Sequence, residues 1–137
     1  MGNQVKKLTL LLVIIFTFLF STTSWGDWSF VVEGVSGVKF YYDKDRVKKN
    51  RKYLYFWELQ DNLKPNKWGD LSVTQYTELD CSIFRFKILK GQLYKNSMGE
   101  GNISHEFTPK GENGEWRYPK PDTFGEVLYN KICEEHQ

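Results

Sequence analysis

Two different periodicities divide this chain of 137 residues. Apolar residues alternate with a period of two in segments 28–34, 37–43, 52–59 and 71–89. Helical spacing appears only near the end, where Phe124, Val127, Leu128 and Ile132 fall on one face. Strands that come first and a single helix that comes last predict the α+β class. We therefore expect a mostly antiparallel sheet that is covered on one face by a C-terminal helix.

The first strands have clear boundaries. The composition of Gly34–Gly37 is typical of a turn, so the strands on either side are predicted to form a β-hairpin. Segment 53–59 is apolar on both faces, which predicts an interior strand with something covering each side. Its members are Tyr53, Tyr55, Trp57 and Leu59 on one face and Leu54 and Phe56 on the other.

Segment 71–89 changes its apolar phase between Cys81 and Phe84. Because a slip of one residue exchanges the two faces of a strand, this predicts either two strands with a tight break or one strand with a bulge. Segment 97–116 holds four of the 11 glycines and is predicted to be a long flexible loop or a hairpin tip. Thr123 and Glu126 fit a capping box, which predicts a helix over residues 123–134.

The N-terminus has the pattern of a secretory signal peptide. Lys6 and Lys7 precede thirteen residues, 8–20, that are apolar apart from two threonines, and small polar residues follow. The alternative is a membrane anchor, but thirteen residues span roughly 20 Å as a helix, against a hydrocarbon core of roughly 30 Å. We expect residues 1–24 to be removed, with cleavage before Trp25 or before Asp27, and residues 25–137 to form one domain without a transmembrane segment. No cysteine lies near this boundary, so we expect no lipid anchor.

Cys81 and Cys133 are the only cysteines, and both lie in the exported part. An even pair in an oxidising compartment most simply forms a disulfide. The two residues lack the CxxC spacing of redox proteins and the clustered spacing of structural zinc sites. We therefore expect one structural disulfide, and no metal or other cofactor.

Charge and motifs exclude several classes of function. Lys and Arg number 19 and Asp and Glu number 17; without Lys6 and Lys7 the balance is 17 against 17. This neutrality argues against a nucleic-acid binder. No nucleophile elbow, HExxH or phosphate-binding loop is present, which argues against an enzyme. A carboxylate site formed by Asp43, Asp70, Glu78 and Asp80 remains the alternative.

The best candidate for binding is a basic run at residues 44–52, and an anionic protein or surface would be its partner. The alternative is a solvated loop whose lysines discourage strand pairing. Its six cations are Lys44, Arg46, Lys48, Lys49, Arg51 and Lys52.

Most of the five tryptophans are expected in the core, because the domain is small. Trp68 is the exception, since it lies in a loop with Pro65 and Gly69. There it either marks an interface or folds back over the sheet as a lid, and we favour the lid.

Several elements, taken in order, resemble the surface-adhesin protein E-like family of Gram-negative bacteria. They are Tyr41–Asp43 with the basic run, the aromatic strand that ends in Trp57, Glu78–Cys81, Met98–Gly101, Trp116 with a proline three residues on, and a short helix that closes on Cys133. The resemblance implies a six-stranded antiparallel sheet, a C-terminal helix and a disulfide between Cys81 and Cys133. It also implies a surface domain that is not an enzyme.

These observations favour an exported, periplasmic or secreted binding domain of the cell envelope, with an adhesin-like role in protein binding. The second hypothesis is a small periplasmic accessory protein that forms a homodimer through a sheet edge.

Overall fold

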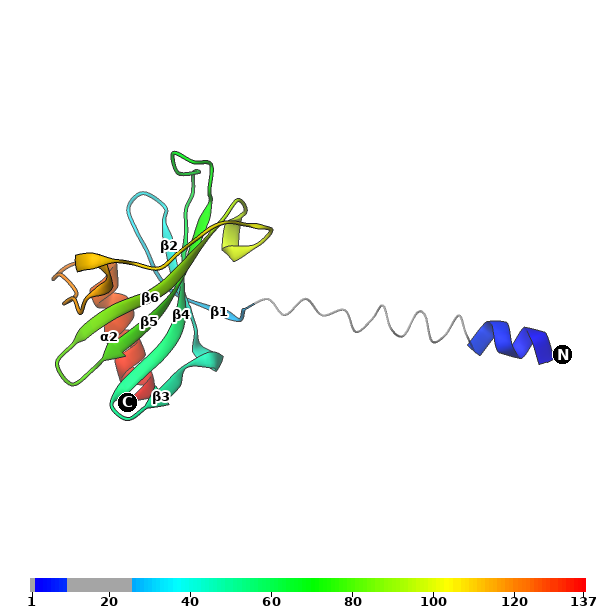
Figure 1. Ribbon diagram of the computed structural model, residues 1–137, viewed down its shortest axis with the longest axis horizontal. Helices are drawn as coiled ribbons and strands as arrows, with labels where there is room; N and C mark the ends of the chain where they lie inside the picture. The colour runs from blue at the N-terminus through cyan, green and yellow to red at the C-terminus, as the bar shows by residue number, and fades with distance from the viewer. Residues whose placement is uncertain (1, 10–25) are drawn as a thin grey trace.

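The computed structural model describes residues 2–9 and 26–137. Seven strands form one antiparallel sheet in the order β1-β2-β4-β5-β6-β7, and β3 pairs with β4 (Figure 1). The strands are β1 (Trp28–Glu33), β2 (Lys39–Asp43), β3 (Lys48–Asn50), β4 (Tyr53–Asp61), β5 (Ser72–Asp80), β6 (Arg85–Tyr94) and β7 (Ile103–Phe107). Helix α2 (Phe124–His136) follows the last strand. The α+β prediction is confirmed.

The predicted signal peptide overlaps residues that the structure leaves undescribed, 1 and 10–25, so it stays a prediction. Within the described residues, no helix has both the length and the apolar character needed to cross a membrane.

The hairpin and the interior strand are confirmed. β1 pairs with β2 across the Gly34–Gly37 turn, where Gly37 has φ +80°. β4 lies between β5 on one side and β2 and β3 on the other. The change of apolar phase between Cys81 and Phe84 arises from two strands with a tight break, the first of the two predicted causes. β5 and β6 are separate strands joined by a tight turn at Cys81–Phe84. The bulge lies farther along, where Tyr76 pairs with Lys90 and Thr77 with Ile88.

Two segments that were predicted to be loops contain strands. The basic run includes β3, whose Lys48 pairs with Tyr55 of β4. The glycine-rich segment includes β7, an edge strand that pairs with β6. In β7 the ring of Phe107 packs over Gly91, where a Cβ atom would lie only 2.2 Å from Phe107 Cζ. A missing side chain on one strand therefore provides the space for a ring on the next.

Helix α2 covers one face of the sheet, and the core lies between them (Figure 1). Leu128 and Ile132 are buried as predicted, but Phe124 is 38% exposed and stacks on Phe40 with ring centroids 5.0 Å apart. Val127, which shares the predicted apolar helix face, is 46% exposed. The buried hydrophobic residues of this core are Tyr42, Leu54, Phe56, Leu79, Leu128, Tyr129, Ile132 and Cys133.

Both ends of α2 are fixed. At its start, Thr123 Oγ1 accepts a hydrogen bond from the backbone of Glu126, while the Glu126 carboxylate accepts one from the backbone of Asp122. Near its end, Cys133 forms the predicted disulfide with Cys81, and the two Cα atoms lie 5.8 Å apart. The sheet and helix are thus joined covalently at the β5–β6 turn.

A polar group is enclosed within the covered face. Glu58 of β4 lies under α2, where Tyr129 donates a hydrogen bond of 3.5 Å to its Oε1. Its Oε2 is buried without a hydrogen-bond partner among the described residues, as are Thr77 Oγ1 and Arg117 Nε. Burial raises the pKa of Glu58 to about 7, and the bond from Tyr129 offsets only part of this.

Candidate functional site

The sheet face opposite α2, here called the helix-free face, carries most of the aromatic residues that are not in the core. The strand period of two places Tyr55 and Trp57 on this face, because Leu54 and Phe56 point to the helix. Most tryptophans were expected in the core, and this prediction is wrong for those that the structure describes. The large rings on or against this face are Trp28, Phe30, Tyr41, Tyr53, Tyr55, Trp57, Tyr76, Tyr94 and Trp116.

Five of these rings, a stacked pair and a group of three, lie along this face and are here called the aromatic row. Trp116 stacks on Tyr53 with centroids 5.6 Å apart, and Tyr55 lies 6.4 Å from Tyr76. Tyr76 in turn lies 5.2 Å from Trp57. All five are half-buried, so each ring keeps part of its surface in contact with solvent. The row therefore offers a rigid and amphipathic contact surface.

Cations flank the aromatic row. The Lys90 ammonium lies 5.3 Å from the Trp57 centroid and 5.7 Å from that of Tyr76. The Arg85 guanidinium lies 4.4 Å from the Trp116 ring, and the Lys52 ammonium 5.3 Å from the Tyr53 ring. Cation–π attraction holds these charges above the rings, facing outward.

The carboxylates of this face already have partners. Asp80 is fully buried and pairs with Lys52 at 3.2 Å and Arg85 at 3.3 Å. Burial alone would raise its pKa, but the hydrogen bond from Ser82 and the ion pair with Lys52 outweigh burial and lower it to about 2.

Glu78 accepts a hydrogen bond of 2.8 Å from the Tyr55 hydroxyl. Burial and this bond raise the pKa of Tyr55 to about 12.

The four carboxylates considered as a catalytic site in the sequence do not form one cluster. Asp43 pairs with Arg46 and Asp70 pairs with Lys95, so each is engaged in a separate ion pair. Nor do three or more metal-ligating side chains gather in the described part of the chain.

Three lysines of this face form no ion pair with any described carboxylate. They are Lys48, Lys87 and Lys90, here called the lysine triad. Lys48 pairs in register with Tyr55, Lys87 with Glu78, and Lys90 with Tyr76. Lys87 and Lys90 were not predicted as binding residues, although Lys87 falls between the apolar Phe86 and Ile88, which is the pattern of an exposed strand face.

The alternation of β3 divides the basic run between two sides of the sheet. Lys49 pairs with Leu54 and so points to the covered face, opposite to Lys48. Arg46 is held by Asp43 at 2.5 Å, and Lys52 by Asp80. Lys44 and Arg51 are exposed, and Arg51 adopts φ +56° in the β3–β4 turn. The helix-free face therefore combines part of the run with lysines from β6.

A hollow of about 370 Å³ lies at one end of the aromatic row. Trp28, Trp57, Tyr94 and Arg46 line it together with the backbone of Met98–Gly101. Met98 has φ +60°, and its amide donates a 2.7 Å hydrogen bond to the Asp61 carboxylate, which fixes this rim. The hollow extends the contact surface toward β1.

Trp68 does not cover the sheet, so the lid prediction is wrong. Its side chain is 66% exposed in the loop between β4 and β5. Lys67 lies over the ring at 4.2 Å, and a separate hollow adjoins it.

Comparison with known proteins agrees with this architecture. The family model described as surface-adhesin protein E matches residues 28–134. This chain belongs to the surface-adhesin protein E family. The match spans nearly all of the described domain and confirms the resemblance seen in the sequence. No curated protein matches the chain.

Solved structures of protein E share the fold. Crystal form II of protein E from Haemophilus influenzae aligns with a TM-score of 0.59 at 19% identity, over 80% of this chain and 88% of that one. Another structure of the H. influenzae protein gives 0.56 at 18% identity, over 80% and 85%. Protein E from non-typeable H. influenzae gives 0.53 at 18% identity, over 84% and 79%. At these identities the likeness establishes the fold, while family membership supports a role at the cell surface.

Proposed function

We propose that this member of the surface-adhesin protein E family is an exported, non-catalytic binding domain that holds an anionic protein or surface on its helix-free face. The observation that carries the proposal is the lysine triad beside the aromatic row. Unpaired lysines attract and orient an anionic partner, and the rings supply desolvated contact area once it has docked. The carboxylates between the strands of the triad, Glu78 and Asp80, are engaged with neighbours, which leaves the lysines to the partner.

The test measures binding to a sulfated glycan surface, immobilised heparin, across a range of salt concentrations. The variant K48Q/K87Q/K90Q should bind at least about tenfold more weakly and with a shallower salt dependence, because three charges leave the contact. The variant K49Q/K110Q/K120Q removes the same net charge elsewhere and should bind like the unmodified protein. An equal loss in both variants would reduce the interaction to non-specific charge attraction.

Export is a second part of the proposal. The lysine-flanked apolar segment supports removal of residues 1–24 during secretion. Mass spectrometry of the protein from its native host should give a mature N-terminus at Trp25 or Asp27. A membrane-embedded product that retains Met1 would contradict cleavage.

Self-association through a sheet edge is the alternative function, and β7 is the element that favours it. Four of its five residues are exposed, and it pairs only with β6 among the described strands. Sedimentation should then show a concentration-dependent dimer that the variant I103K abolishes, since an edge lysine opposes strand pairing. A monomer at all concentrations would remove this alternative.

A further inference from the structure

We infer that the hollow beside Trp68 is a separate binding site for an uncharged sugar ring, a hexopyranose. This site goes beyond the proposed function, because it lies away from the aromatic row and uses different residues. Its volume is about 420 Å³, and its lining consists of Trp68, Asp70, Leu93, Lys95, Ser104 and His105. These residues come from the β4–β5 loop, the end of β6 and β7.

The Trp68 backbone is held rigidly, although its side chain is exposed. Asn66 Oδ1 accepts hydrogen bonds from the Trp68 amide at 2.9 Å and the Asp70 amide at 3.0 Å. Lys95 Nζ donates to the Trp68 carbonyl at 2.8 Å. The loop is therefore ordered before any ligand arrives, and binding costs little conformational entropy.

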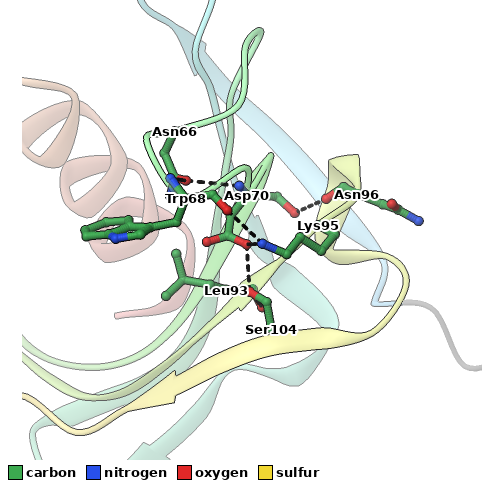
Figure 2. A network of polar contacts seen from close by, with 8 residues as sticks. Asn66, Trp68, Asp70, Leu93, Lys95, Asn96 and Ser104 are labelled. Atoms are coloured by element: carbon green, nitrogen blue, oxygen red, sulfur yellow. Dashed lines mark hydrogen bonds and ion pairs between the residues drawn. The ribbon is translucent and has the colours of Figure 1, made fainter.

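One face of the indole ring is available to a ligand. Lys67 lies over the ring at 4.2 Å and occupies the other face. Figure 2 shows the ring and the Leu93 side chain on the same side of the Asp70 carboxylate. The C–H groups on the less polar face of a pyranose are electron-poor, so they stack well on the electron-rich face of an indole.

Polar groups at the base of the hollow match the hydroxyl groups of a sugar. Asp70 is 3% exposed, and its Oδ1 receives a hydrogen bond of 2.7 Å from Ser104 and an ion pair of 2.9 Å from Lys95. The bonds from Ser104 and Lys95 lower the pKa of Asp70, so its carboxylate stays ionised. Both of these contacts end on Oδ1, so we assign Oδ2 to accept from a ligand hydroxyl.

The charges of the hollow favour an uncharged ligand over an acidic one. Lys95 is neutralised by Asp70, and a sugar carboxylate placed here would face Oδ2 of the same aspartate. A hydroxyl group both donates and accepts, so it satisfies Asp70, Lys95 and Ser104 together without burying a new charge. An exposed aromatic ring beside a carboxylate that is held by Ser104 and Lys95 thus selects a ring that is apolar on one face and hydroxylated at its edge.

The test uses nuclear magnetic resonance on the full chain purified after export, with methyl β-galactopyranoside and methyl β-glucopyranoside as probes and sorbitol as the acyclic control. At least one glycoside should shift the Trp68 indole N–H resonance in the millimolar range and receive saturation transfer at its ring C–H protons. Sorbitol should do neither. If neither glycoside shifts the Trp68 resonance or receives saturation transfer, or if sorbitol gives an equal response, the inference is overturned.

Variants distinguish a sugar site at Trp68 from glycoside binding elsewhere on the protein. W68A should weaken glycoside binding at least about tenfold, and W68F, which keeps a smaller ring, should weaken it less. L63A changes another exposed residue of the same loop and should bind like the unmodified protein. Saturation transfer that persists unchanged in W68A would overturn the site. The variant K48Q/K87Q/K90Q should keep glycoside binding, so failure of the proposed function and failure of this site give different results.

Discussion

The two faces of one sheet differ completely in what they contact. On the covered face, Phe56 and Leu79 pack against α2 with 0% exposure. On the helix-free face, their sequence neighbours Tyr55 and Glu78 form a hydrogen-bonded pair that stays in contact with solvent. The same strands therefore supply the core with alternate residues and the proposed binding surface with the others. This separation lets the helix-free face carry unpaired lysines without weakening the core.

The largest expected effect comes from a core residue. F56A removes a fully buried ring and should lower the free energy of unfolding by about 3–5 kcal/mol. Y55A, one residue away on the other face, should cost roughly 1 kcal/mol. Chemical denaturation of both variants measures the difference. Similar losses would mean that both faces are equally important for stability.

Loss of the disulfide should come next. The variant C81S/C133S opens a link across 52 residues and should lose roughly 2–4 kcal/mol. Because an isolated helix of 13 residues is marginal in water, α2 should be released first. Hydrogen exchange should therefore rise in α2 before it rises in β4 and β5. Uniform exchange across the domain would contradict this order.

Glu58 should make the covered face sensitive to pH. Its pKa rises from 4.5 to about 7 on folding, so below 4.5 both states are protonated and Glu58 contributes nothing. As the pH rises from 4.5 to about 7, Glu58 ionises in the unfolded state before it ionises in the folded state. The free energy of unfolding therefore falls by an amount on the order of 1–3 kcal/mol. Above about 7 both states are ionised and the loss is constant.

Denaturation at several pH values tests this, with one variant on each face. E58Q removes the titrating group but keeps an acceptor for Tyr129, so its stability should be nearly flat between pH 4.5 and 7. E78Q changes a carboxylate of the helix-free face and should keep the slope of the unmodified protein. A slope that survives in E58Q would assign the effect to other groups.

The smallest effect on stability should come from the lysine triad. K48Q/K87Q/K90Q breaks no ion pair among the described residues and should change the free energy of unfolding by no more than about 0.5 kcal/mol. Thermal denaturation checks this value beside the binding measurement. A loss near that of F56A would show that the helix-free face also stabilises the fold.

Much of this architecture is readable from local patterns. The hairpin around Gly37, the interior strand that contains Phe56 and the capped helix after Thr123 all depend on near neighbours in the chain, so their signals are contained in short segments. The pairing of Cys81 with Cys133 was also predictable, because the chain offers no other cysteine. Family membership was indicated by the order of several short motifs.

The missed features depend on contacts between distant segments. β7 has weak strand character, and it forms because β6 offers an open edge and because Gly91 leaves space for Phe107. Val127 fits the helix stripe, but the position of α2 on the sheet buries Tyr129 instead. Neither outcome follows from residues close together in the sequence.

The sequence by itself determined the class of the fold, its strand faces and its single disulfide, since each depends on residue type and spacing. Only the tertiary structure decided which face the helix covers, and hence which aromatic residues stay at the surface. It also brought Lys48 onto the same sheet face as lysines of β6 and gathered Trp68, Asp70 and Ser104 around one hollow, because strand order and loop packing set those positions. The physical reason is that a period of two separates the faces of a strand, while only packing decides which face meets the helix.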